Sequence, residues 1–265
     1  MLALLSSCSK GKPNAFDRAG YHVREGVVWY LPSWTSEPFV VKDADVASLK
    51  FPLPKGTDQD FARDATHVFL SGKTIPGADP ATFEIFDHRF SRDARNVYLG
   101  HDVFCGDPAH FSRVSGNFVK NGHSVYLITQ AGRGEVVSKD PANFSELSGA
   151  DSYSFCADRA QVFVNGNPIE GAQPASFKVL DGGYTRDAAR TYYFDKPMPD
   201  GTDADTLQPL AGGYAKDRGR VYYLGKVLAG ADAATFEITD PKWPKAKDKN
   251  RAWEQGSAVP GGKSE

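Results

Sequence analysis

Residues 214–236 read YAKDRGRVYYLGKVLAGADAATF, and the same order of residue types recurs along the chain. The shared order is an aromatic and a small residue, Lys/Arg-Asp, three turn residues, a Val-aromatic pair, a glycine, and a segment similar to Ala-Asp-Pro-Ala-Thr-Phe, with substitutions in single copies. Seven copies lie between Tyr21 and Ile238, and a truncated eighth follows. A fixed period is the signature of units that bury their apolar faces against neighbouring copies. The sequence therefore predicts a tandem repeat protein.

The period is clearest at the first position of the Val-aromatic pair, which recurs about every 30 residues with one longer interval. The members of this column are Val68, Val97, Val125, Val162, Thr191, Val221 and Ala252. The longer interval contains Gln130-Ala131-Gly132-Arg133-Gly134, a composition typical of a protruding turn. Insertions are thus expected in loops.

The Asp-x-x-x-Val spacing between two apolar stretches predicts a β-hairpin, because an aspartate at the first turn position accepts hydrogen bonds from N–H groups two or three residues further on. We interpret these aspartates as turn-forming residues: Asp64, Asp93, Asp158, Asp187, Asp217 and Asp248. The following strand ends at a glycine such as Gly225, a position suited to a turn or bulge. A second short strand follows, and the Asp-Pro-Ala-Thr-Phe segment predicts one helical turn.

A column of aromatic residues follows the valine column by one position. Its members are Phe69, Tyr98, Tyr126, Phe163, Tyr192, Tyr222 and Trp253. We expect these rings to form a packed structural ladder, because aromatic area is used mainly for burial; a ligand-stacking platform is the alternative. The fold class predicted is all-β, with hairpin repeats stacked as an open array or solenoid. A small propeller is the alternative, although its blades usually need about 40 residues.

The pattern Tyr/Phe-Ala-Lys/Arg-Asp-x-x-x-Val-Tyr-Tyr-x-Gly-Lys, followed by Ala-Asp-Pro-Ala-Thr-Phe, resembles the DKNYY family of bacterial repeat proteins. Residues 214–236 fit this pattern well, and Asp248-Lys249-Asn250 preserves its first three letters. The earliest copy departs from it, with Arg24 where Asp is expected. The resemblance covers most of residues 21–255. It implies a cell-envelope protein and supplies no catalytic residue.

The amino terminus carries a possible localisation signal. Leu5-Ser6-Ser7-Cys8 resembles the lipobox of bacterial lipoproteins, in which the cysteine receives the lipid. A secretory signal also has a basic start and a longer apolar stretch, which are missing here, and a cytosolic terminus is the alternative. We therefore expect a lipoprotein-type signal remnant and tether at 1–20, a repeat domain at 21–255 and a disordered tail at 256–265, with Cys8 as the lipid anchor.

Composition limits the partners. The formal net charge is −2 and no basic cluster is present, which argues against nucleic acid, because neutralising phosphates needs concentrated Lys and Arg. No stretch approaches 18 apolar residues, so no transmembrane helix is expected. Apart from Cys8, Cys105 and Cys156 remain, and such a pair in an oxidising compartment can form a disulfide if the geometry allows.

Catalytic motifs are sparse. The histidines, all in the first half, are His22, His67, His88, His101, His110 and His123. They show no metal-binding spacing, and no Cys-x-x-Cys or Gly-x-Ser-x-Gly motif occurs. The run Asp200-Gly201-Thr202-Asp203-Ala204-Asp205 is rich in carboxylates but lacks the order of a calcium loop. Asp203 aligns with the capping aspartates and Asp205 with Ala81, which favours a structural role. We assign no catalytic residue, metal or cofactor.

Three functions remain open. The first is a non-enzymatic cell-envelope lipoprotein, facing the periplasm or the cell exterior, that binds or scaffolds another envelope protein or a glycan. The second is an envelope hydrolase acting on glycans through carboxylates from several turns. The third is a mechanical spacer. The repeat, the lipobox and the lack of a catalytic set favour the first.

Overall fold

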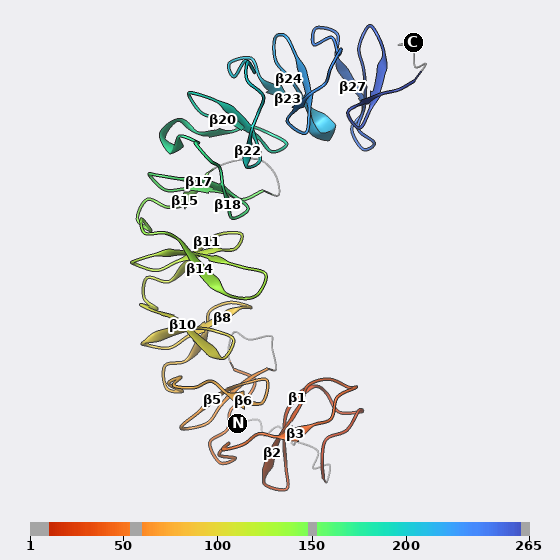
Figure 1. Ribbon diagram of the computed structural model, residues 1–265. Helices are drawn as coiled ribbons and strands as arrows, with labels where there is room; N and C mark the ends of the chain where they lie inside the picture. The colour runs from red at the N-terminus through yellow and green to blue at the C-terminus, as the bar shows by residue number, and fades with distance from the viewer. Residues whose placement is uncertain (1–10, 54–59, 148–152, 261–265) are drawn as a thin grey trace, which may run out of the picture. The chain divides into compact units, whose positions relative to one another are not determined.

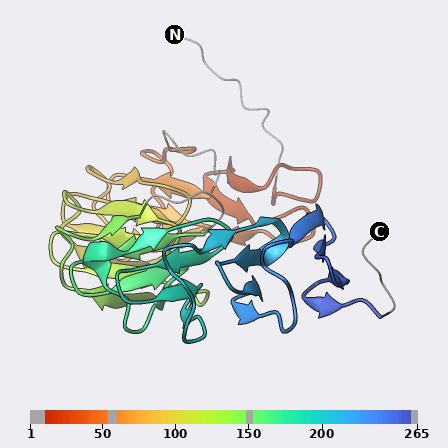
Figure 2. The same ribbon diagram turned by 90° about the horizontal axis from the view of Figure 1, so that it is seen from above.

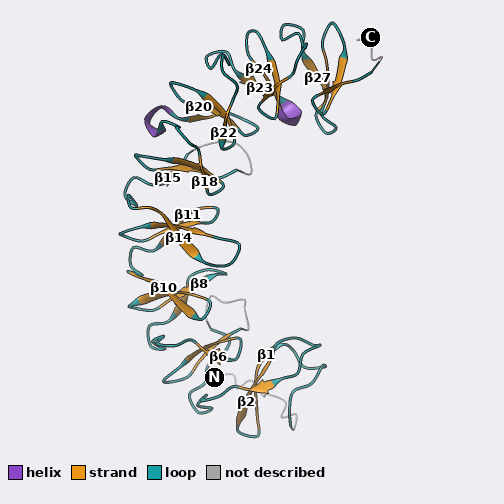
Figure 3. Cartoon of the chain, viewed as in Figure 1, coloured by secondary structure: helices purple, strands orange, loops and turns teal. Residues whose placement is uncertain are grey.

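The computed structural model describes residues 11–53, 60–147 and 153–260. In these residues, thirty strands form eight antiparallel sheets, and the helical structure consists of two short 3-10 helices (Figure 3). The chain divides into two compact units, Met1–Phe111 and Ser112–Glu265, each described by itself. The all-β prediction is confirmed.

Unit 1 contains sheets 1, 2 and 3, numbered in chain order. Sheet 1 comprises β1 (Gly20–Arg24), β2 (Val27–Leu31) and β3 (Phe39–Val40). Sheet 2 comprises β4 (Phe61–Arg63), β5 (Val68–Leu70) and β6 (Lys73–Thr74). Sheet 3 comprises β7 (Glu84–Ile85), β8 (Phe90–Arg92), β9 (Asn96–Leu99) and β10 (Asp102–Gly106).

Unit 2 contains sheets 4 to 8, each with four strands. Sheet 4 comprises β11 (Ser112–Ser115), β12 (Phe118–Lys120), β13 (Val125–Ile128) and β14 (Gly134–Ser138). Sheet 5 comprises β15 (Ser145–Glu146), β16 (Phe155–Ala157), β17 (Val162–Val164) and β18 (Asn167–Pro168). Sheet 6 comprises β19 (Lys178–Val179), β20 (Tyr184–Arg186), β21 (Thr191–Tyr193) and β22 (Lys196–Pro197), and is preceded by η1 (Pro174–Ser176). Sheet 7 comprises β23 (Gln208–Pro209), β24 (Tyr214–Lys216), β25 (Val221–Tyr223) and β26 (Lys226–Val227), with η2 (Ala211–Gly213) between β23 and β24. Sheet 8 comprises β27 (Glu237–Asp240), β28 (Lys245–Lys247), β29 (Ala252–Glu254) and β30 (Ser257–Ala258).

Within each unit the sheets follow one another as an open row and do not close into a ring or barrel (Figures 1 and 2). The open-array prediction is therefore confirmed over the propeller. Each four-stranded sheet has one strand more than the hairpin and third segment expected from the repeat. In sheet 3 the additional strand is β7, which pairs Glu84 with Arg92 and Ile85 with Ser91. Two residues are too few for a recognisable period-two pattern.

The core lies between consecutive sheets. In sheet 7, Val221 and Tyr214 face sheet 8 and pack with Trp253, whereas Tyr222 faces sheet 6 and packs with Tyr184. This follows from the alternation of side chains along a strand, which sends neighbouring residues to opposite faces. The valine column thus faces forward along the row, and the aromatic column faces backward.

The aromatic column is not a continuous ladder of rings. Tyr98 meets Phe83 at 6.2 Å between centroids, and Tyr192 meets Phe177 at 6.0 Å, so each ring packs against the phenylalanine of the preceding turn. The valine of the same strand occupies the opposite face and separates one aromatic ring from the next. Tyr126 is only half-buried, whereas the other six members of the column are buried.

The segment expected to form a helical turn is a hydrogen-bonded turn in most copies. At Asp79 the carbonyl accepts from Thr82 at 3.3 Å and from Phe83 at 2.9 Å, and the chain then extends into β7. The segment forms a 3-10 helix at η1. Because the next strand begins directly after the phenylalanine, the helical geometry cannot propagate.

A turn that contains glycine joins the third and fourth strands of several sheets. Leu224 and Gly225 have φ values of 48° and 76°, so both central residues of the turn are left-handed, as in the type I′ turns that favour glycine. A Cβ on Gly225 would lie 2.5 Å from the Cβ of Tyr193 in the preceding sheet. This glycine is therefore needed both for the turn and for close packing.

Residues near both ends of the repeat region make contacts with it. Within the expected tether, Asp17 accepts a hydrogen bond of 2.5 Å from Arg24, and Lys12 forms an ion pair of 2.6 Å with Glu37. Within the expected disordered tail, β30 pairs with β29, and Val259 donates to Ala252 at 2.9 Å. Ser257 and Ala258 thus supply the fourth strand of sheet 8.

Candidate functional site

The turn-forming aspartates connect two copies of the repeat. One carboxylate oxygen of Asp217 accepts from the N–H groups of Gly219 at 2.8 Å and Arg220 at 2.6 Å, within its own turn. The other oxygen accepts from the N–H of Asp203 at 3.0 Å, in the preceding turn, and from the hydroxyl of Tyr222 at 2.6 Å. The carboxylate thus satisfies four donors in a buried position.

The other aspartates repeat this arrangement with small variations. Bonds to the two N–H groups of their own turn are made by Asp64, Asp93, Asp158, Asp187 and Asp248. Burial raises the pKa of Asp217, but the hydrogen bonds from Tyr222 and the backbone outweigh it, and the net pKa lies below the usual value. The carboxylate therefore stays ionised near neutral pH.

In five copies, the basic residue before the turn-forming Asp or Asn binds the following turn. Arg63 donates to the carbonyl of Pro80 at 2.8 Å, and Lys216 donates to the carbonyl of Ala233 at 3.3 Å. Arg92, Lys120 and Arg186 make the corresponding bonds to Pro108, Pro141 and Ala204. The Lys/Arg-Asp pair therefore links its own copy to the turns on both sides.

Two further polar groups connect the copies. Thr235 donates to the carboxylate of Asp232 at 2.7 Å and accepts from the N–H of Lys249 at 3.0 Å. The hydroxyl of Tyr184 donates to the carbonyl of Gly213 at 2.9 Å and accepts from the N–H of Gly225 at 3.2 Å. These polar residues of the repeat motif thus hold neighbouring copies together.

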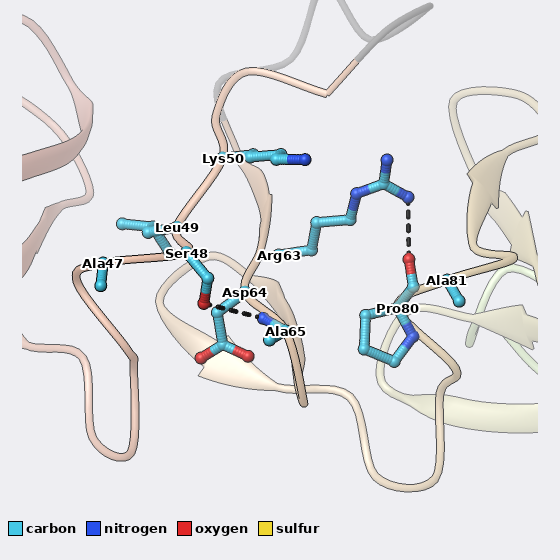
Figure 4. A pocket seen from close by; sticks show the side chains of 9 residues that line it. All are labelled: Ala47, Ser48, Leu49, Lys50, Arg63, Asp64, Ala65, Pro80 and Ala81. Carbon is cyan, nitrogen blue, oxygen red and sulfur yellow. Dashed lines mark hydrogen bonds between the residues drawn. The ribbon is translucent and has the colours of Figure 1, made fainter.

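A pocket of about 380 Å³ lies in unit 1 beside sheet 2 (Figure 4). Its lining residues are Ala47, Ser48, Leu49, Lys50, Arg63, Asp64, Ala65, Pro80 and Ala81. Figure 4 shows the side chains of Lys50 and Arg63 extending alongside one another, with Ala81 beyond the guanidinium. Asp64 also lines the pocket, but its carboxylate accepts from the N–H groups of Asp45, Thr66 and His67. The pocket therefore carries two positive groups and one carboxylate that is already bound. The repeat motif does not predict this pocket, because Lys50 lies outside the motif.

The histidines do not form a common site. His67 lies 3.5 Å from the carboxylate of Asp64, and His110 lies 2.6 Å from that of Asp107. His101 contacts the carbonyl of Leu70 at 3.0 Å. In the part of the chain that the structure describes, no group of three or more His, Cys, Asp or Glu residues is placed to bind a metal.

The carboxylate-rich run at Asp200–Asp205 is engaged in local contacts. Asp203 accepts from the N–H of Asp205 at 3.1 Å and lies 3.9 Å from the guanidinium of Arg218. Asp205 forms an ion pair of 3.2 Å with Arg186. Two of its three carboxylates, those of Asp203 and Asp205, thus contact protein groups.

The possible disulfide between Cys105 and Cys156 is not formed. Cys105 on β10 and Cys156 on β16 are not joined, and they belong to different compact units. Cys156 is fully buried among Phe118, Phe144 and Phe163, where its thiol cannot reach an external partner. Burial raises the pKa of the Cys156 thiol to about 11, so the reactive thiolate is disfavoured. Cys8 lies outside the described residues.

In the described residues, no helix has the length and apolar character needed to cross a bilayer.

Comparison with known proteins identifies a family. Neither the curated proteins nor the solved structures that were compared contain a significant match. A model of the DKNYY family matches residues 6–102 and 118–257. Because this match covers well over half of the 265 residues, the chain belongs to the DKNYY family.

Proposed function

We propose that this chain is a non-enzymatic binding or scaffolding module of the bacterial cell envelope. The observation that carries the proposal is the engagement of the repeat carboxylates by backbone donors, as at Asp217. A general acid needs a raised pKa, whereas these hydrogen bonds lower the pKa of Asp217. The residues that recur in every copy are thus suited to building an extended surface.

The proposed location is the envelope, with a lipid on Cys8 and the repeats facing the periplasm or the cell exterior. Support comes from the Leu5-Ser6-Ser7-Cys8 sequence. The proposed partner is another envelope protein or a glycan. A Cys8→Ala variant is expected to move from the membrane fraction to the soluble fraction, whereas Cys105→Ala, the matched control, is expected to stay with the membrane.

The binding role is tested by immobilising the purified chain and presenting envelope extracts and isolated cell-wall glycan. We expect saturable retention of one envelope protein or of the glycan, with no turnover of model glycosides. Turnover of a glycoside without any retained partner would contradict the proposal and favour a glycan hydrolase. Because the assay reads retention by the whole chain, its outcome does not depend on any single pocket.

A further inference from the structure

Beside sheet 2, the positive side chains of Lys50 and Arg63 lie opposite each other. The N–H of Lys50 donates to the carbonyl of Arg63 at 2.7 Å, and the N–H of Arg63 donates to the carbonyl of Lys50 at 3.1 Å. Residues that pair in this way project their side chains to the same face, where like charges destabilise the sheet. In the described residues, neither side chain has a carboxylate within ion-pair distance.

Two other sheets have an acid at this register. Glu84 is paired with Arg92 in sheet 3, and the two form an ion pair of 2.6 Å. Glu237 is paired with Lys247 in sheet 8 at 3.3 Å. At the place of this strand, sheet 2 has only Lys50, which pairs with Arg63 through an isolated bridge. The repeat architecture therefore accommodates an anion beside the basic residue.

In sheet 6, two basic residues also lie opposite each other, and one of them forms an ion pair with a carboxylate. Lys178 lies opposite Arg186, and the carboxylate of Asp205 lies 3.2 Å from the Arg186 guanidinium. The same guanidinium donates to the carbonyl of Ala204 at 2.7 Å, as Arg63 does to Pro80 at 2.8 Å. The residue after this carbonyl is thus Asp205 in one copy and Ala81 in the other.

We propose that the pocket at Lys50 and Arg63 binds the carboxylate of an acidic, sugar-sized ligand. Ala81 lines the pocket at the position where Asp205 supplies a carboxylate in sheet 6. A guanidinium offers planar donors that match a carboxylate, and the ammonium of Lys50 adds a second positive charge. A volume of about 380 Å³ is within the range of small-molecule sites. This proposal deepens the binding role above and rests on it.

The first test is NMR titration of the full chain with galacturonate, with galactose as the neutral control and galactose 6-phosphate as the phosphate arm. Galacturonate is expected to shift the amide signals of residues 47–50, 63–65 and 81, and galactose is not. Ala81→Asp, which copies Asp205, and Lys50→Glu, which copies Glu84, are each expected to weaken binding by about ten-fold or more. Both variants introduce residues that other copies tolerate, so the fold is retained.

Sheet 6 offers a complementary test. Asp205→Ala removes the built-in carboxylate, and we expect it to create a second galacturonate site near Arg186. The matched control is Asp200→Ala, because Asp200 lies in the same loop, is exposed and uses only its backbone carbonyl to contact Arg220. Here the stoichiometry is expected to stay at one.

The proposal is overturned if galacturonate does not bind, if Ala81→Asp and Lys50→Glu bind it as the parent chain does, or if Asp205→Ala gains no site. Tighter binding of the phosphate sugar than of galacturonate would also overturn the assignment to a carboxylate. If the immobilised chain still retains an envelope partner in those cases, the binding role stands and only the pocket assignment is lost.

Discussion

At the residue scale, the aspartate of the Lys/Arg-Asp pair binds several donors at once, and the carboxylate of Asp217 accepts four hydrogen bonds. Asp217 closes its own turn and fixes the preceding turn through the N–H of Asp203. A carboxylate accepts several hydrogen bonds at once, which a hydroxyl or an amide cannot do to the same extent. Where the copy has Asn121 instead, its side-chain oxygen accepts from the N–H groups of His123 and Ser124.

Replacing this aspartate leaves partly buried donors without their acceptor. Asp217→Ala is expected to lower the free energy of unfolding by about 3 kcal/mol, because the N–H groups of Asp203, Gly219 and Arg220 lose their partner. Urea unfolding followed by circular dichroism measures the change. Asp200→Ala, an exposed aspartate nearby, is expected to have an effect within about 0.5 kcal/mol. Equal losses in the two variants would contradict the role of Asp217.

The tyrosine beside the aspartate predicts sensitivity to alkaline pH. Burial, with the hydrogen bond to Asp217, raises the pKa of Tyr222 to about 12, whereas tyrosine in an unfolded chain titrates near 10. The folded state favours the protonated hydroxyl, so this contribution to stability is complete below about pH 10 and is lost as the pH rises through about 12.

The urea midpoint measured at increasing pH tests this sign. We expect the midpoint of the parent chain to fall above about pH 10. Tyr222→Phe is expected to start from a lower midpoint and to fall less steeply, because one titrating group is gone. Tyr98 and Tyr192 also have pKa values raised to about 12 and keep some of the slope in the variant. A variant with an unchanged slope would refute the assignment to Tyr222.

At the element scale, the turn between the third and fourth strands fixes how closely two sheets approach. Gly225 at the turn leaves its α-carbon against the Tyr193 side chain of the preceding sheet, and Gly256 does the same against Tyr223. Glycine is thus required by two conditions, a left-handed backbone and the absence of a side chain. The turn sets the spacing of the row.

A matched pair of glycines separates these two conditions. Gly26→Ala introduces strain alone, because Gly26 has φ of 75° and no atom within 4 Å of an added Cβ; we expect a loss of about 1 kcal/mol. Gly225 has φ of 76°, and an added Cβ would also lie 2.5 Å from the Cβ of Tyr193. For Gly225→Ala we therefore expect the free energy of unfolding to fall by about 3 kcal/mol. Thermal unfolding compares the two variants, and a Gly225→Ala loss no larger than that of Gly26→Ala would show that the contact relaxes freely.

Much of the element structure follows from local sequence. The Asp-x-x-x-Val spacing predicts the hairpins, and the glycine predicts the turn after the third strand. The strand at Glu84–Ile85 could not be predicted, since two residues carry no periodicity and its pairing depends on the register with Arg92. The pocket could not be predicted for the same reason. Alignment of the copies shows that Asp205 and Ala81 occupy equivalent positions, but only the bridge between Lys50 and Arg63 shows that these two basic residues face each other.

At the scale of the whole molecule, a row of sheets buries its interior only while every copy has a neighbour. In unit 2, sheet 8 covers sheet 7: the hydroxyl of Tyr214 donates to the carbonyl of Pro244 and accepts from the N–H of Gly256, both at 3.0 Å. Trp253 packs in the same core. Sheet 8 therefore protects the apolar face of sheet 7.

Ending the chain after Pro241 tests this protection. The truncated protein loses β28, β29 and β30, and we expect a lower unfolding midpoint and aggregation visible by light scattering, because Tyr214 and Val221 become accessible. A chain ending after Pro260 keeps all strands and serves as the control. Unchanged solubility and melting after the longer truncation would show that sheet 7 needs no cover.

The hydrogen bonds between turns also bear on how such a chain can change its length in evolution. Asp187 accepts from Gln173 in the turn before it, and Asp217, thirty residues later, accepts from Asp203 in the same way. Deleting residues 188–217 would join Asp187 to Arg218 and rebuild an equivalent junction from the parts on either side. Gene duplications and deletions of one whole period are therefore structurally silent at the seam, whereas a deletion that removes one partner of a junction and leaves the other breaks it. We therefore expect relatives of this chain to differ by complete copies or by changes within loops.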